Sequence, residues 1–434
     1  MKTLNLNPGN KVKLQTKERT WEGHILESHD PEIILLKLSS GYNIGIRESE
    51  IISVKILEKV SKGKLKPQET VDVLGKLERN ADLPNIAIII TGGTISSRLD
   101  PKTGGVIYTD AEDILTIAPE IKKICNITKI EKPFMKWSEN MSFKDWKTMA
   151  KTAEKFLNDK KIDGIIITHG TDTLHYTSAA LSFFLKNLNK PVAITYSQRS
   201  IDRGSTDAHL NLICAAHYAV SDIAEIALIG HKNLNDKICQ AMPGVKVRKM
   251  HTSRRDAFKI INDKPIAKIT KDELKILKEF NARNQNKVKL DSSFNSKIGL
   301  IKIYPGQDPK ILDFYEKQKY RGLILELTGL GHAPGKDSLH NWLPKIKKLI
   351  DKGMIICGAP QTIYGGLNPN VYSAGRELQK TGIIFLKDML PETALVKLGW
   401  VLGHKSWIKD KETIKEKMLE NVVGEFNRGL GFEF

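Results

Sequence analysis

The chain has 434 residues, of which 40% are hydrophobic and 27% are charged, a globular composition that allows two to three domains with sizeable cores. No apolar run approaches the roughly 18 residues that a membrane helix needs, and the first 20 residues lack the continuous apolar segment of an export signal. The four cysteines include no Cys-x-x-Cys pair, which favours neither a zinc ribbon nor a disulfide framework. We therefore expect no membrane span and a cytoplasmic location.

The formal net charge of +18 leaves two interpretations open. Clustered Lys and Arg bind polyanions by releasing counterions, so the charge could serve a nucleic-acid partner. The alternative is a solvated, lysine-rich surface, because the lysines spread along the chain and form no single basic patch.

The N-terminal part alternates polar and apolar residues in short runs, from about residue 10 to residue 58, broken by Gly, Asp-Pro and Ser-Gly. Such strand periodicity with turn residues predicts a small antiparallel barrel or sheet, which we assign to residues 1–60. The next stretch, 61–83, is polar and lysine-rich and loses the alternation, so it predicts a linker.

From residue 84 onward, buried strands alternate with helical patterns, which predicts an α/β fold whose parallel sheet is covered on both faces. We assign residues 84–275 to a larger α/β lobe and residues 296–434 to a smaller one, joined by a polar stretch around 262–295. Ligands of such sheets bind beyond the carboxyl ends of the strands. The unusual residues of this chain stand at those ends.

The first candidate site is "AIIITGGTISS", residues 87–97, in which a buried strand runs into Gly92, Gly93 and Thr94. Two glycines allow the backbone close to a ligand, and N–H groups left free in such a turn can hold an oxyanion. The alternative is an ordinary tight turn. A dinucleotide loop is excluded, because the Gly-x-Gly-x-x-Gly pattern is absent.

The second candidate is "THGTDTLHYTS", residues 168–178, which follows the buried run "DGIIIT". His169 and His175 lie six residues apart and are not an i, i+4 pair, so a metal site is disfavoured. The alternative is a threonine, Thr171, that acts as nucleophile or activates water beside the carboxylate of Asp172. Acyl transfer would still need a group that takes the proton.

The third candidate is the basic run "PGVKVRKMHTSRRDAF", residues 243–258, which is typical of a solvated face or a phosphate patch. A lysine of this run buried against Asp172 could instead shift toward neutrality and act as a base. A fourth stretch, "GLGHAPGKDS", departs from a Walker loop because Asp337 follows Lys336. We expect no ATP binding there.

Taken together, "TGGTISS" and "THGTDTLHYTSAALSFF", each at the end of a buried strand, resemble the two signatures of the bacterial-type L-asparaginase family. The likeness covers roughly residues 84–405 and includes "WSENMSF", "RSIDRGSTDAHLNL", "GVKVRKMHTSRRDAF", "APQTIYGGLNPNVYSAGRELQKTGII" and "LPETALVKLGWVLG". It implies an α/β, asparaginase-like, two-lobed parallel-sheet fold, here preceded by a small all-β barrel domain.

The resemblance also implies the roles of four catalytic residues. Thr94 corresponds to the nucleophile that attacks a side-chain amide and forms an acyl-enzyme with loss of ammonia. Thr171 and Asp172, with Lys249, correspond to a second catalytic group in which lysine and aspartate polarise the threonine or a water molecule.

The remaining site residues concern substrate binding. Ser138 and Glu139 occupy the positions that hold the α-carboxylate and the α-ammonium of the substrate, and many free-standing asparaginases carry glutamine where Glu139 stands. Tyr108 corresponds to the tyrosine of a loop that closes over the nucleophile, while Gly93 and Gly170 bring the backbone close to the substrate. His169 and His175 are expected to orient the loop or to pack behind it.

The prepended β domain and the lysine-rich tract after the basic run resemble one branch of this family, the ammonia-supplying components of archaeal tRNA-dependent amidotransferases. This resemblance implies glutamine as amide donor and a partner, the E subunit, that uses ATP and Mg²⁺ to activate the glutamate of Glu-tRNA(Gln) and makes most contacts with tRNA(Gln). It implies a homodimer at the core of a heterotetramer, with no metal or other cofactor on this chain. The alternatives are a free-standing L-asparaginase and a catalytically inactive scaffold that binds RNA or a protein.

Overall fold

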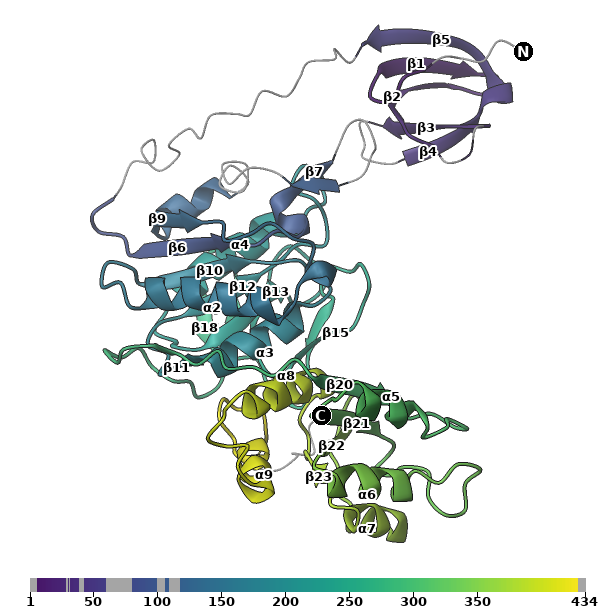
Figure 1. Cartoon of the computed structure of the whole chain (residues 1–434). Coiled ribbons are helices and arrows are strands. Elements are labelled where there is room, and N and C mark those ends of the chain that lie inside the picture. The colour runs from purple at the N-terminus through teal and green to yellow at the C-terminus, as the bar shows by residue number, and fades with distance from the viewer. Residues whose placement is uncertain are drawn as a thin grey trace.

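The computed structural model describes residues 6–28, 30, 32–38, 43–59, 80–99, 106–108 and 118–427. Figure 1 presents, in chain order, a curved β sheet, a large α/β lobe and a smaller α/β lobe. Of the predicted linker at 61–83, only the last four residues belong to the described part of the chain. No helix among the described residues is both long and apolar enough to cross a membrane.

The N-terminal sheet is antiparallel throughout, in the order β4-β3-β2-β1-β5. Its strands are β1 (Lys11–Thr16), β2 (Thr20–Leu26), β3 (Ile33–Leu38), β4 (Asn43–Arg47) and β5 (Ile51–Glu58). Their alternating side chains bury one face, in which Val12, Leu14 and Leu36 are fully buried. The predicted antiparallel β domain is confirmed, although within the described residues no pairing of β4 with β5 closes it into a barrel.

The large lobe contains a sheet of eight strands in the order β18-β17-β14-β13-β12-β10-β6-β9. These strands are β6 (Asn85–Ile90), β9 (Asn126–Glu131), β10 (Gly164–Thr168), β12 (Val192–Thr195), β13 (Ile226–His231), β14 (Cys239–Pro243), β17 (Ala267–Ile269) and β18 (Leu274–Ile276). The first five of them are parallel, as predicted. The last three are antiparallel, because the connection from β13 to β14 is too short for a crossover helix.

Helices cover both faces of this sheet. On one face α2 (Phe143–Leu157) and α3 (Leu174–Phe184) bury Met149, Phe156 and Phe183, while α4 (Ala208–Ala219) covers the other face in a separate core. The segment after β6 contains the short 3₁₀ helix η4 (Pro119–Lys123), which packs with α4, whereas the segment after β10 is α3. The connections of these two adjacent strands thus leave on opposite faces, which is the arrangement at which open α/β sheets bind ligands.

The smaller lobe is a parallel sheet in the order β20-β21-β22-β23. Its elements are β20 (Ile298–Lys302), α5 (Ile311–Lys317), β21 (Gly322–Leu327), α6 (Leu343–Asp351), β22 (Ile355–Pro360), α7 (Ser373–Gln379), β23 (Ile384–Phe385), α8 (Pro391–Leu402) and α9 (Lys411–Leu419). Helix α8 packs against α3 of the large lobe, and Trp400 of α8 stacks on Phe183 with 5.5 Å between ring centroids. The two lobes therefore share one apolar core.

Short elements complete the chain and correct one prediction. They are η1 (Glu48–Glu50), η3 (Thr94–Ser96), β7 (Ser97–Leu99), β8 (Val106–Tyr108), η5 (Ser138–Asn140), β11 (Leu185–Lys186), β15 (Val247–Lys249), β16 (Phe258–Ile260) and β19 (Lys289–Leu290). The polar stretch at 262–295 is not simply a connection between lobes, because β17 and β18 belong to the main sheet and β19 pairs with β11. The predicted end of the large lobe at residue 275 falls inside β18.

Candidate active site

The loops that follow β6 and β10 touch through two glycines. Gly93 has a φ of +80°, and a Cβ added to it would lie 2.4 Å from the Cα of Gly170. A Cβ added to Gly170 would in turn lie 2.8 Å from the Oγ of Ser138. Only residues without a side chain allow this approach. The first two predicted sites are thereby brought together, with the loop that carries Ser138 beside them.

Hydroxyl hydrogen bonds tie the loop of Thr94 to β10 and close the loop on itself. Thr91 donates from its Oγ1 to the carbonyl oxygen of Thr168 at 2.7 Å, and Ser97 donates from its Oγ to the carbonyl oxygen of Gly93 at 2.7 Å. Thr94 begins η3 directly after Gly93 and is half-buried. Its position is therefore set by the backbone turn on one side and by the contact with Gly170 on the other.

Thr171, Asp172 and Lys249 form one hydrogen-bonded group. The Lys249 ammonium donates to the Oγ1 of Thr171 at 2.8 Å and to the Oδ1 of Asp172 at 2.7 Å. The side chain of Lys249 is 13% exposed and that of Asp172 is 58% exposed, so the group borders solvent on the carboxylate side. The structure thus contains the contact that the sequence suggested between the basic run and Asp172. In its neutral amine form, Lys249 Nζ would lie within hydrogen-bond reach of the proton on Thr171 Oγ1.

Ser138 positions the loop of this group. Its buried Oγ accepts the backbone N–H of Asp172 at 3.0 Å, and its carbonyl oxygen accepts the hydroxyl of Thr173 at 2.7 Å. Glu139, the next residue of η5, is exposed. The backbone of Tyr108 pairs with that of Ser97 in the β7–β8 hairpin. The side chain of Tyr108 is not among the parts that the structure describes.

His169 is a buried support of the second loop. Its Nδ1 lies 2.6 Å from the carbonyl oxygen of Gly170 and its Nε2 lies 2.9 Å from the Oγ1 of Thr177, which accepts the indole N–H of Trp146 at 3.0 Å. Burial lowers the pKa of His169 to about 4, so the ring is neutral near pH 7 and donates from Nδ1 to Gly170. His169 thus holds the glycine that contacts Gly93.

His175 packs behind the same loop. Burial lowers the pKa of His175 to about 3, and the positive charges of Arg248 and Lys249 contribute to this lowering. Its ring lies 4.7 Å from that of Tyr176 between centroids. Both histidines therefore occupy the supporting places expected from the sequence. The described residues contain no group of three or more His, Cys, Asp or Glu side chains that could hold a metal ion.

Two features of this region have no counterpart in the sequence expectations. Thr177 and Trp146, which complete the hydrogen bonds of His169, lie on the buried faces of α3 and α2, where helical periodicity indicates only packing. Lys246 and Arg248 bind carboxylates of the smaller lobe instead of solvent or phosphate.

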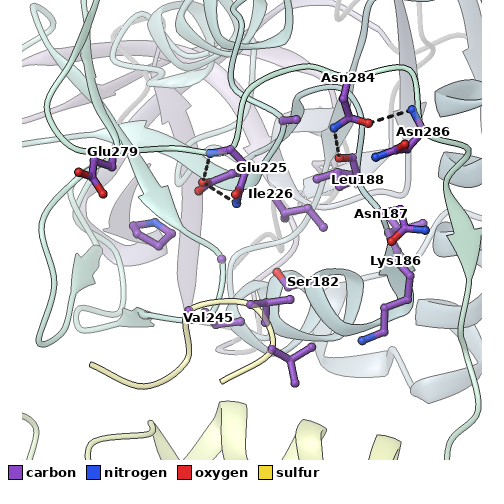
Figure 2. Close-up of a pocket in the computed structure, with 18 of the residues that line it drawn as sticks. Ser182, Lys186, Asn187, Leu188, Glu225, Ile226, Val245, Glu279, Asn284 and Asn286 are labelled. Carbon is purple, nitrogen blue, oxygen red and sulfur yellow. Dashed lines mark hydrogen bonds between the residues drawn. The ribbon is translucent and has the colours of Figure 1, made fainter. Parts of the chain in front are cut away.

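The structure contains a cavity at each end of the large lobe's sheet. One, of about 320 Å³, is lined by Asp172 and by residues 249–252 and opens beside the candidate catalytic group. The other, of about 560 Å³, is lined at the far end by residues that include Lys186, Glu225 and Asn284, and Figure 2 presents it in close-up. It contains none of the predicted catalytic residues.

The fold and this arrangement of residues define an asparaginase-like protein, and sequence comparison agrees. Residues 85–282 match the family "Asparaginase, N-terminal", residues 297–418 match "Glutaminase/Asparaginase C-terminal domain", and residues 6–57 match "GatD N-terminal domain". Among solved structures, the thermostable L-asparaginase from Thermococcus kodakarensis superposes with a TM-score of 0.70 at 30% identity, covering 80% of this chain and all of that one. L-asparaginase I from Vibrio cholerae gives a TM-score of 0.68 at 29% identity, covering 80% of this chain and 99% of that one.

Relatives that cover nearly the whole chain make the family assignment more specific. The D subunit of glutamyl-tRNA(Gln) amidotransferase from Thermococcus kodakarensis is 45% identical over 430 residues, covering 97% of this chain and 94% of the relative. The D subunit from Pyrococcus abyssi is 42% identical, covering 100% and 98%, and that from Methanothermobacter thermautotrophicus is 40% identical, covering 98% and 95%. The chain belongs to the family formed by the D subunits of glutamyl-tRNA(Gln) amidotransferases.

Proposed function

We propose that this chain hydrolyses the side-chain amide of glutamine to glutamate and ammonia and supplies the ammonia for conversion of Glu-tRNA(Gln) to Gln-tRNA(Gln). The observation that carries the proposal is the hydrogen-bonded group of Thr171, Asp172 and Lys249, which stands beside the loop of Thr94 at the carboxyl end of the sheet. A hydroxyl, a carboxylate and an amine in contact are the parts that activation of a poor nucleophile requires.

The proposed reaction has two steps. In the first, Thr94 Oγ1 attacks the amide carbon and its proton passes to the amide nitrogen, so that collapse of the tetrahedral intermediate releases ammonia and leaves an ester on Thr94. In the second, water polarised by Thr171, Asp172 and Lys249 hydrolyses the ester to glutamate and regenerates the hydroxyl. Backbone N–H groups of the glycine turns would stabilise the oxyanion of each intermediate.

Substrate recognition is proposed to use the loop between the two catalytic groups. Ser138 would bind the α-carboxylate of glutamine, and the exposed carboxylate of Glu139 would bind its α-ammonium. Tyr108 would close over Thr94. The backbone at Gly93 and Gly170, where no side chain fits, would line the bound amide.

The remaining chemistry is assigned to a partner. We place ATP, Mg²⁺ and most tRNA(Gln) contacts on the E subunit, and we place a homodimer of this chain at the core of a heterotetramer. Identity that extends through the N-terminal domain to relatives named as D subunits supports this assignment, because the L-asparaginases cover only 80% of the chain.

The test is ammonia release from glutamine and from asparagine by the purified chain, alone and with its partner and Glu-tRNA(Gln). We expect glutamine turnover to be slight alone and to rise when both are added. Rapid asparagine turnover that the additions do not change would instead identify a free-standing asparaginase. Salt-sensitive RNA binding without turnover of either amide would identify a scaffold.

A further inference from the structure

The strand that carries Lys249 contacts the smaller lobe as well as its own neighbours in the large lobe. Among the described strands, β15 pairs with β16 alone and is not part of the eight-stranded sheet, so the large sheet does not determine its register. Successive side chains of a strand point to opposite faces. Along this one, Val247 lies in the apolar core with α3 and Lys249 reaches Thr171, while Lys246 and Arg248 point the other way.

That second face is attached to a single short segment of the smaller lobe, residues 388–393, at the start of α8. The ammonium of Lys246 lies 2.6 Å from the Oδ2 of Asp388, and both side chains are buried, with exposures of 0% and 4%. The Nε of Arg248 lies 3.0 Å from the Oε1 of Glu392. One residue before Lys246, the carbonyl oxygen of Val245 accepts the hydroxyl of Thr393 at 2.9 Å.

The same helix also fixes the other half of the candidate catalytic group. Helix α8 packs against α3, whose N-terminus follows Thr171 and Asp172 directly. Helix α8 therefore contacts both β15, which carries Lys249, and α3, which follows Thr171 and Asp172. A displacement of α8 would change the distance from Lys249 Nζ to Thr171 Oγ1.

We propose that Lys246 and Arg248 are positioning residues, which hold Lys249 in contact with Thr171 and Asp172 through Asp388 and Glu392 of the smaller lobe. Buried ion pairs contribute little net stability compared with apolar side chains of similar volume, but they impose a directional contact. A directional contact is needed at this strand, because no second strand in the described part of the chain pairs with β15. A misplacement of about 1 Å can cost on the order of a hundredfold in rate. This inference rests on the proposed function.

The decisive experiment removes both charges of the Lys246 pair and compares it with a matched pair elsewhere. In Lys246→Met/Asp388→Asn the amide oxygen can still accept the backbone N–H of Asn427, which Asp388 accepts at 3.2 Å. The control is Lys397→Met/Glu425→Gln, whose wild-type pair is equally buried, lies 2.6 Å apart and joins α8 to residue 425 without touching β15. We expect kcat for glutamine in the assembled complex to fall about ten- to a hundredfold in the first variant with KM unchanged, and neither to change in the control.

Hydrogen exchange gives a readout that does not depend on turnover. Loss of protection at residues 247–249 in Lys246→Met/Asp388→Asn, with protection kept in the control, supports the positioning role. Protection and kcat equal to wild type overturn it, and so does an equal loss of kcat in both variants, which would indicate a general effect of α8. If the wild-type complex releases no ammonia from glutamine, the proposed function fails, and hydrogen exchange still decides whether the smaller lobe holds β15.

A second variant, at the Arg248–Glu392 pair, covers the case in which Lys246→Met/Asp388→Asn does not fold. The side chain of Arg248 is 26% exposed and that of Glu392 is 8% exposed, and Arg248→Gln/Glu392→Gln neutralises both, so no unpaired buried charge remains. We expect its melting temperature to stay within a few degrees of wild type and its kcat to fall without a change in KM. Wild-type kcat in this folded variant would contradict the role of Arg248.

Discussion

At the scale of single residues, Lys249 offers the most direct test, because its ammonium contacts both Thr171 and Asp172. Lys249→Met keeps the aliphatic stem and removes the amine, so we expect ammonia release to fall at least about a hundredfold, the usual contribution of a positioned acid–base group. Lys259→Met is the control, because Lys259 lies opposite Arg248 on β16 and pairs with Asp256. Ammonia release by Lys249→Met at the rate of Lys259→Met would exclude the proposed catalytic group.

His169 predicts how stability depends on pH. Its pKa falls from 6.5 to about 4 on burial, so the unfolded chain binds more protons than the folded chain between these values. Stability contributed by the neutral ring is therefore complete above pH 6.5 and is lost as pH falls toward 4, by about 3 kcal/mol at most. The variant His169→Asn keeps an amide that can donate to Gly170. When its unfolding free energy is measured in urea at several pH values, it should change less between pH 4 and 6.5 than that of the wild type.

A residual slope is expected in His169→Asn, because burial also lowers the pKa of His175. His209→Asn serves as the control, since His209 is 44% exposed and pairs with Glu120 at the surface. An unchanged slope in His169→Asn would mean that the ring is charged in the folded state or that the loop opens above pH 4.

At the scale of elements, the two glycine turns decide whether the candidate groups meet. Gly93→Ala would place a methyl group 2.4 Å from Gly170 Cα, so the loops after β6 and β10 must separate. Gly306→Ala is a control for positive φ, because its φ of +77° resembles the +80° of Gly93 and nothing lies within 4 Å of the added Cβ. We expect Gly306→Ala to cost about 1 kcal/mol of left-handed strain with full activity.

Gly93→Ala is expected to lower the melting temperature further than Gly306→Ala and to abolish ammonia release. Thermal unfolding and an ammonia assay on the two variants make the comparison. If both variants behave alike, backbone strain alone accounts for Gly93, and the contact between the loops is unimportant for activity.

The elements also indicate which parts of the structure a sequence can predict. β6, β10, β12 and β13 were predictable because each is a buried apolar run whose length suits a strand and excludes a helix of ordinary size. The sequence does not indicate that β14, β17 and β18 extend the sheet in antiparallel pairing, because short strands with mixed composition, such as Leu274–Ile276, have no clear hydrophobic period. Strand direction depends on connection length and on tertiary pairing.

The candidate site likewise contains residues that the sequence predicts and residues that it does not. Thr94, Thr171 and Asp172 stand at ends of apolar strands, so their common place at one edge of a parallel sheet follows from local pattern. The supports of the site were not predictable, because Lys246 meets Asp388 across 142 positions of sequence and Thr177 looks like any buried helical residue. Only the folded chain relates such residues.

At the scale of the whole molecule, the N-terminal domain and the catalytic lobes have separate interiors. Among the described residues, the core of the first, which includes Val12, Leu14 and Leu36, shares no residue with the cores of the α/β lobes, whereas one core joins those lobes to each other. All candidate catalytic residues lie after residue 84. We therefore expect a chain that starts at residue 80 to fold and to release ammonia from glutamine at the slow rate of the isolated full-length chain.

The same truncation should remove the response to the partner. If the N-terminal domain docks the E subunit or Glu-tRNA(Gln), the truncated chain keeps its own rate, while the rise on adding both is lost. The measurement is ammonia release by the full-length and the truncated chain, each alone and with both additions, with thermal unfolding to establish that the truncated chain is folded. A full rise in the truncated chain would place the docking surface on the α/β lobes, and loss of the rate without additions would mean that the N-terminal domain supports the loop of Thr94 directly.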